Sequence, residues 1–331
     1  MSYYDFVKNY MHVNECKNNQ KYSEAGHTFC WNKDSLAQAE GLYWFYEGDG
    51  FIIDIHDFYI KEEIIEKSTY NMSDYVSIYS SYVISANGER FDPYQTLTAN
   101  SLFTLDFDNI RDNFLFLLHE NSYYLTVSIG FTRDFLKKHL SSLNIDSDSF
   151  YSDLFQSNKI ILTKSLEKVA MEILHCEMKT PAAELFFRAK ASEWISIAIN
   201  THLIKRNCKI NYDDNQALED VAKFLEDHFA INVNQQTLEK ISKMSGTKLK
   251  DLFKKKYGQS ITEYTQRKRM NVAELLLLNT NLPINEIAKS VGYSSHSKFS
   301  IYYKRYKGKL PTEVRNSSHE YRTNWKCENC D

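Results

Sequence analysis

The chain has 331 residues and a formal net charge of −3, with 43% hydrophobic and 25% charged residues. This composition excludes a wholly disordered chain, and the length favours two domains over a single core. No apolar run approaches the roughly 18 residues that span a bilayer, and residues 1–11 lack the apolar stretch of a signal peptide, so a cytoplasmic protein without membrane contact is expected.

Short runs of β-branched and aromatic residues fill the segment from residue 40 to residue 131. Polar turns such as Ala86-Asn87-Gly88-Glu89 separate these runs. Many short strands at this spacing predict an antiparallel barrel or sandwich.

Helical periodicity replaces the strand pattern from residue 132 to about residue 206. Thr132 is expected to cap a first helix, a second spans residues 165–175, and the longest spans residues 182–205. The apolar stripe of the longest helix packs either against the strands of its own domain or against a second copy of the chain.

Positive charge is concentrated near the C-terminus. Residues 234–310 hold 16 Lys and Arg but 5 Asp and Glu, so they carry +11 and leave −14 for the rest of the chain. A basic module on an acidic body predicts that only this part meets a polyanion. The predicted division is an N-terminal domain at residues 1–207, a linker at 208–213, a helical domain at 214–316 and a disordered tail at 317–331.

The six cysteines show no metal-binding pattern. Cys327 and Cys330 form a single Cys-x-x-Cys pair, which supplies only two of the four ligands of a structural zinc site. We expect this pair to lie in the disordered tail, and the other cysteines to be reduced thiols of a cytoplasmic chain.

The helical domain repeats one pattern, a short helix, a turn and a Lys-rich second helix that stops at glycine. The copies span residues 238–258 and 284–308. In the second copy Ala288 lets the two helices approach, Gly292 suits a turn with positive φ, and Ser294 is expected to cap the following helix. Two such helix-turn-helix units predict the recognition of neighbouring turns of a DNA major groove.

Residues 214–315 resemble the AraC/XylS family of transcription regulators. The family signature is matched by Ile287-Ala288-Lys289-Ser290-Val291-Gly292-Tyr293 and then by Phe299, Lys304, Gly308, Pro311 and Arg315, with Tyr293 and Tyr303 in place of phenylalanine. The resemblance implies an α+β protein with two domains, a C-terminal all-α double helix-turn-helix that binds double-stranded DNA, and contact with RNA polymerase.

The resemblance also implies an antiparallel cupin-like β-barrel, followed by helices, in the N-terminal domain. Such domains bind a small effector or form a homodimer. Aromatic and histidine side chains on the expected strands either fill the core or line an effector pocket: Trp44, Tyr46, His56, Tyr59 and Tyr79.

The position of each residue on its second helix predicts its role toward DNA. Base edges are expected to be contacted by side chains near the helix N-terminus, namely His296, Ser297, Lys298 and Ile301 and, by the family register, Thr247, Lys250 and Asp251. Phosphates are expected to be contacted by Lys248, Lys254, Lys255, Lys256, Ser295, Lys304, Arg305 and Lys307. Asp251 either accepts from a cytosine amino group or weakens binding.

The first unit departs from the family spacing. If Ile241-Ser242 is its apolar-small pair, the turn between its helices is about three residues short. A register with Leu238-Glu239 at the pair restores the length but places a glutamate at a buried small position. We therefore expect sequence readout mainly from the second unit.

No catalytic triad, phosphate-binding loop or dinucleotide fingerprint is present in the sequence, so no catalytic residue or cofactor is predicted. His56 lacks the His-x-His partner of a metal-binding cupin, so no metal is predicted either. Two alternatives stay open, a cupin-type enzyme with an appended basic module and a protein whose first helix-turn-helix is impaired.

Overall fold

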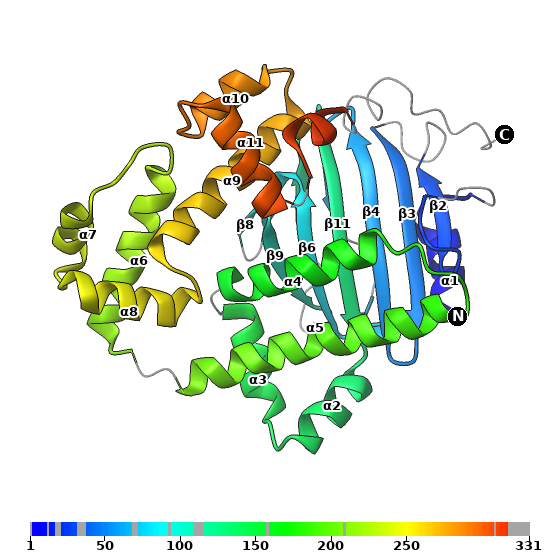
Figure 1. The fold of residues 1–331 in the computed structure, drawn as a ribbon. Helices are drawn as coiled ribbons and strands as arrows, with labels where there is room; N and C mark the ends of the chain where they lie inside the picture. The colour runs from blue at the N-terminus through cyan, green and yellow to red at the C-terminus, as the bar shows by residue number, and fades with distance from the viewer. Residues whose placement is uncertain are drawn as a thin grey trace. The chain divides into compact units, whose positions relative to one another are not determined.

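The computed structural model describes residues 2–11, 13–16, 21–31, 38–67, 72–91, 94–108, 115–156, 159–207, 210–307 and 309–316. The chain divides into two compact units, residues 1–202 and residues 203–320 (Figure 1). The predicted domain boundaries stay a prediction. The predicted disordered tail, with Cys327 and Cys330, lies outside the described residues.

The N-terminal unit contains two antiparallel sheets. The larger has the strand order β1 (Asn14–Glu15), β2 (His27–Trp31), β3 (Ala39–Gly48), β4 (Phe51–Ile60), β11 (Ser122–Phe131), β6 (Ile78–Ser85) and β9 (Ser101–Asp106). The smaller has the order β5 (Ile64–Lys67), β10 (Leu115–Leu118), β7 (Asn87–Phe91) and β8 (Gln95–Thr98). The predicted antiparallel pairing is confirmed.

The predicted closed cupin-like barrel is not observed in the described strands. The outermost strands of each sheet pair with one neighbour, so the described residues form two open sheets. A barrel closes only when its edge strands meet in register. Alternating runs of apolar residues predict strands but not the partners of the edge strands, and for this reason the sequence did not distinguish the two outcomes.

The helices of this unit are α1 (Tyr3–Tyr10), the 3₁₀ turn η1 (Met72–Asp74), α2 (Arg133–Ser142), α3 (Ser147–Gln156), α4 (Lys159–Leu174) and α5 (Ala182–Asn207). Thr132 caps α2 as predicted, because its side chain accepts from the amide of Phe135. Helices α4 and α5 lie across one face of the larger sheet (Figure 1). Trp194 of α5 is 1% exposed, and its indole Nε1 donates to Ser80 Oγ of β6 at 3.2 Å. The α5 stripe at Trp194 therefore packs against its own sheet.

Two apolar clusters lie on opposite faces of the larger sheet, because side chains alternate along a strand. Trp44 of β3 belongs to the cluster under the helices, together with Phe187 of α5. The next residue, Phe45, belongs to the other cluster, together with Leu97 of the smaller sheet.

The prediction of reduced thiols is wrong for Cys16 and Cys30, which form a disulfide with a Cα–Cα distance of 5.9 Å. Antiparallel pairing of β1 with β2 places Asn14 opposite Cys30, and the amide of Cys16 donates to the carbonyl of Thr28 at 2.9 Å. Strand pairing thus brings together two cysteines whose sequence separation is 14 residues.

The C-terminal unit is helical among the described residues. Its helices are α6 (Tyr212–Asp227), α7 (Gln235–Ser242), α8 (Gly246–Tyr257), α9 (Ile261–Asn279), α10 (Ile284–Ser290) and α11 (His296–Lys307). Helix α9 packs against α8 and also against α10 and α11, so it connects the two helix pairs.

Arg269 of α9 supports this arrangement from inside the unit. It is 5% exposed, and its guanidinium donates to the carbonyls of Phe229 at 2.6 Å and Ile231 at 3.0 Å. The same group lies 5.7 Å from the ring centre of Tyr293. Arg269 therefore fixes the segment between α6 and α7 against α9 and against Tyr293, which lies in the turn between α10 and α11.

Candidate nucleic-acid interface

The second helix-turn-helix unit, residues 284–308, has the expected geometry. Gly292 has φ +85°, which confirms the predicted left-handed turn, and a Cβ at this position would lie 2.2 Å from the carbonyl oxygen of Ala230. The predicted cap is wrong by one residue, since Ser295 and not Ser294 accepts from the amide of Lys298. Helix α11 therefore begins at His296, one residue later than predicted.

The first turns of α11 present the predicted base-contacting residues to solvent. His296, Ser297 and Lys298 are exposed, and Ile301 is 69% exposed. Phe299 and Tyr303 are 0% exposed and belong to the core shared with α9 and α10. An outward isoleucine beside polar residues suits contact with a thymine methyl group and neighbouring base edges.

The first helix-turn-helix unit, residues 238–258, follows the register in which Leu238-Glu239 takes the place of the apolar-small pair. Lys243 has φ +52° and lies five residues after Leu238, just as Gly292 lies five residues after Ile287. The cap of α8 is Ser245, two residues after Lys243, whereas Ser295 lies three residues after Gly292. The turn is therefore one residue shorter than in the second unit, and the predicted loss of three residues is wrong.

Glu239 occupies the position of Ala288 without being buried. It is partly exposed, and its Oε1 accepts from Gln235 Nε2 at 2.6 Å. The room comes from Gly246 at the start of α8, where a Cβ would lie 2.4 Å from Glu239 Oε1. The small residue at the helix contact is thus on the second helix in this unit and on the first helix in the other.

Two of the lysines predicted to contact phosphate are buried. The side chain of Lys256 is 3% exposed and donates to Glu219 Oε1 and to the carbonyl of Asn215, both at 2.9 Å. The side chain of Lys307 is 5% exposed and donates to Glu274 at 2.8 Å. Burial lowers the pKa of both amines. Lys256 faces α6 and Lys307 faces α9. The sequence did not predict this, because a run of basic residues does not show which side of its helix is buried.

The other basic candidates lie on the surface. Lys254 and Lys255 of α8 are exposed, as are Lys304 and Arg305 at the equivalent positions of α11. The first-unit base candidates Thr247, Lys250 and Asp251 are exposed as well. Ser295 uses its hydroxyl as a helix cap, and Lys248 forms an ion pair with Asp214.

Comparison with known proteins agrees with this geometry. A family described as a helix-turn-helix domain matches residues 238–317. The arabinose operon regulatory protein of Escherichia coli is 29% identical over 103 residues, which are 31% of this chain and 35% of that protein. The chain therefore carries an AraC-type helix-turn-helix domain near its C-terminus.

Other relatives match the AraC-type domain over a similar length. The Msm operon regulatory protein of Streptococcus mutans is 32% identical over 35% of this chain and 40% of its own length. The solved C-terminal domain of the two-component response regulator yesN from Fusobacterium nucleatum is 31% identical, with a TM-score of 0.29, over 30% of this chain and 98% of that domain. The chain thus spans less than half the length of the two operon regulators.

Among the described residues of the AraC-type domain, one buried hydroxyl has no hydrogen-bond partner. Tyr303 Oη is buried and has no partner among the described residues, and burial raises its pKa well above the usual range. Phe253 is the equivalent residue of the first unit and is also 0% exposed.

Tyr303→Phe should therefore raise the free energy of unfolding by about 1 kcal/mol, because it removes an unsatisfied buried polar group. Urea denaturation would measure the change. Tyr257→Phe is the matched control, since Tyr257 Oη donates to the carbonyl of Leu218 at 3.2 Å and its loss should destabilise the domain. Equal effects of the two changes would contradict the argument.

The candidate effector residues of the N-terminal unit do not line one pocket. Trp44 and Tyr46 lie under α5, and their ring centroids are 5.3 and 5.1 Å from that of Phe187. Tyr59 of β4 is on the same face of the sheet, because it lies four residues from Ile55, which pairs with Trp44. Tyr79 lies in the cluster on the opposite face. His56 lies on that face too, with Nδ1 3.3 Å from Asp54 Oδ1.

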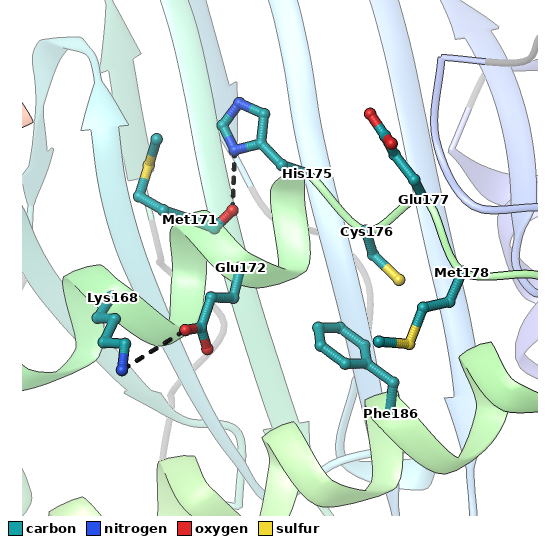
Figure 2. Close-up of a pocket in the computed structure, with 8 residues that line it drawn as sticks. All are labelled: Lys168, Met171, Glu172, His175, Cys176, Glu177, Met178 and Phe186. Carbon is teal, nitrogen blue, oxygen red and sulfur yellow. Dashed lines mark hydrogen bonds and ion pairs between the residues drawn. The ribbon is translucent and has the colours of Figure 1, made fainter. Parts of the chain in front are cut away.

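A pocket of about 640 Å³ lies between the end of α4 and the start of α5 (Figure 2). Sequence reasoning missed it, because its lining comes from two helix ends and the segment between them. It is lined by Lys168, Met171, Glu172, His175, Cys176, Glu177, Met178 and Phe186. None of the five effector candidates is among these residues.

No helix among the described residues is long and apolar enough to cross a bilayer. Within the same ranges, no group of three or more His, Cys, Asp and Glu side chains is arranged to hold a metal ion.

Proposed function

We propose that the protein is a sequence-specific DNA-binding transcription regulator. The observation that carries this proposal is the second helix-turn-helix, in which the first turns of α11 present His296, Ser297, Lys298 and Ile301 above a fully buried core. A recognition helix reads bases with its N-terminal residues, and the residues at this end of α11 are exposed.

The two exposed basic pairs support contact with the DNA backbone. Lys254 and Lys255 end the exposed part of α8, and Lys304 and Arg305 do so on α11. Contacts of this kind set affinity and position but carry no sequence information. The proposal therefore separates base-reading residues from phosphate-binding residues within each helix.

Replacing both His296 and Lys298 by alanine should relax sequence preference while leaving binding to random DNA nearly unchanged. Each bidentate base contact discriminates by about 1–3 kcal/mol, so the ratio of specific to random affinity should fall about tenfold or more. Selection of bound sequences from a random duplex pool, followed by titration, would measure both affinities.

The matched variant Lys304→Ala with Arg305→Ala should weaken binding to specific and random duplexes alike. It should also lower the slope of log affinity against log salt by about 1 for each lost phosphate contact. If the first variant lost specific and random binding equally, the assignment of α11 residues to base reading would be wrong.

Finer roles are also proposed. The N-terminal unit would bind a small effector or form a homodimer, and the DNA-bound regulator would contact RNA polymerase in the cytoplasm. In support of an effector, the face of the sheet opposite the helices buries polar groups, where Tyr79 Oη donates to Asp54 at 2.7 and 2.8 Å. The matched relatives are named as regulators, which favours this proposal over an enzyme.

A further inference from the structure

One predicted phosphate-binding lysine of the first unit is held by a carboxylate of α6. Lys248 Nζ lies 2.8 Å from Asp214 Oδ1, and the side chains are 50% and 17% exposed. The two residues are 34 positions apart in the sequence and come from helices that pack together within the C-terminal unit.

Asp214 is itself fixed in place. Its other oxygen, Oδ2, accepts from Asn211 Nδ2 at 3.1 Å, and its amide donates to Asn211 Oδ1 at 2.7 Å. Asn211 is the cap of α6. Because Asn211 already holds the carboxylate, the Asp214 side chain loses little further conformational freedom when it pairs with Lys248 of α8.

The second unit provides an internal comparison. Lys298 lies three residues after its cap Ser295, as Lys248 lies three residues after its cap Ser245. Lys298 is exposed and forms no ion pair with any residue that the structure describes. At this shared helical position, the lysine of the first unit is paired with a carboxylate of another helix.

We propose that Asp214 competes with DNA phosphate for Lys248 and so lowers the contribution of the first unit to DNA affinity. This inference rests on the proposed function. A carboxylate and a phosphate oxygen are alternative acceptors for one ammonium group, so Lys248 must leave Asp214 to bind the backbone. Asp214 is an affinity-determining residue that does not touch the DNA.

Asp214→Asn in the 331-residue chain should raise affinity for a random duplex pool about two- to fivefold at low salt, the range expected for an exposed ion pair. The slope of log affinity against log salt should steepen by about 0.9, because one more phosphate is neutralised. Fluorescence anisotropy over a salt series would measure both. Thermal unfolding would confirm that the variant stays folded.

Asp213→Asn is the matched control, because Asp213 lies in the same first turn of α6, is exposed and carries the same charge. It should leave the salt slope unchanged. In a Lys248→Ala background, Asp214→Asn should likewise leave the slope unchanged.

Equal effects of the two asparagine variants would overturn the inference, since net charge alone would then explain them. A lower affinity of Asp214→Asn would also overturn it, because Asp214 would then orient Lys248 toward DNA. Wild-type protein that bound no DNA with a steep salt dependence would instead refute the proposed function itself.

Discussion

Gly292→Ala should destabilise the AraC-type domain by about 2–5 kcal/mol and abolish specific DNA binding. An alanine at φ +85° is strained, and its Cβ would lie 2.2 Å from the backbone oxygen of Ala230, which cannot rotate away. The turn that positions α11 would have to move. Urea denaturation and duplex binding would measure the two effects.

Gly246→Ala is the control for this prediction. A Cβ at Gly246 would meet the ends of two flexible side chains, Gln235 and Glu239, which can adopt other rotamers. Its cost should stay within about 0.5 kcal/mol. Similar losses at the two glycines would show that the close backbone approach at Gly292 is not the cause.

Glu274→Gln should destabilise the same domain by about 3 kcal/mol. The side chains of Glu274 and Lys307 are 11% and 5% exposed, and their charged atoms lie 2.8 Å apart. Removing one partner of a buried ion pair leaves a charge inside the protein that a neutral acceptor, such as Asn271 Oδ1 at 3.1 Å from Lys307 Nζ, does not balance. Denaturant unfolding at neutral pH would measure the loss.

Burial lowers the pKa of Lys307, and the Glu274 charge, which opposes this shift in the wild type, is absent from the variant. The unfolded chain holds the proton up to the ordinary pKa of 10.5, whereas the folded variant releases it at lower pH. Because the unfolded state binds more protons in this window, stability should rise as pH increases toward that value. The deficit of Glu274→Gln should therefore shrink in alkaline solution.

Glu219→Gln is the matched control for the buried pair. Glu219 also accepts from a buried lysine, Lys256, but its own side chain is 51% exposed, and Lys256 keeps the carbonyl of Asn215. The expected loss is below about 1 kcal/mol. A loss as large as that of Glu274→Gln would contradict the importance of burying both partners.

Local sequence patterns predicted much of the DNA-binding domain. Gly292 was placed in a left-handed turn because glycine tolerates positive φ, and the residues near the start of the following helix were placed toward DNA because recognition helices read bases with that end. The first unit was harder to read, because Lys243 takes the left-handed conformation without being glycine. The correct register was one of two that the sequence left open.

The N-terminal unit shows which features local sequence patterns do not predict. Alternating residues predicted antiparallel strands, and the structure confirms them. The predicted effector residues are divided between opposite faces of the sheet, and the paired cysteines were expected to be reduced. Strand neighbours and edge pairing depend on contacts between distant segments, which periodicity does not encode.

The sequence by itself determined the two helix-turn-helix units, because turns, caps and helical faces depend on neighbouring residues. Only the tertiary structure decided which cations remain free for DNA. Lys256 and Lys307 are buried against Glu219 and Glu274, and Lys248 is paired with Asp214. The availability of a lysine for DNA depends on whether a carboxylate from another helix lies within reach, and that condition is set by packing.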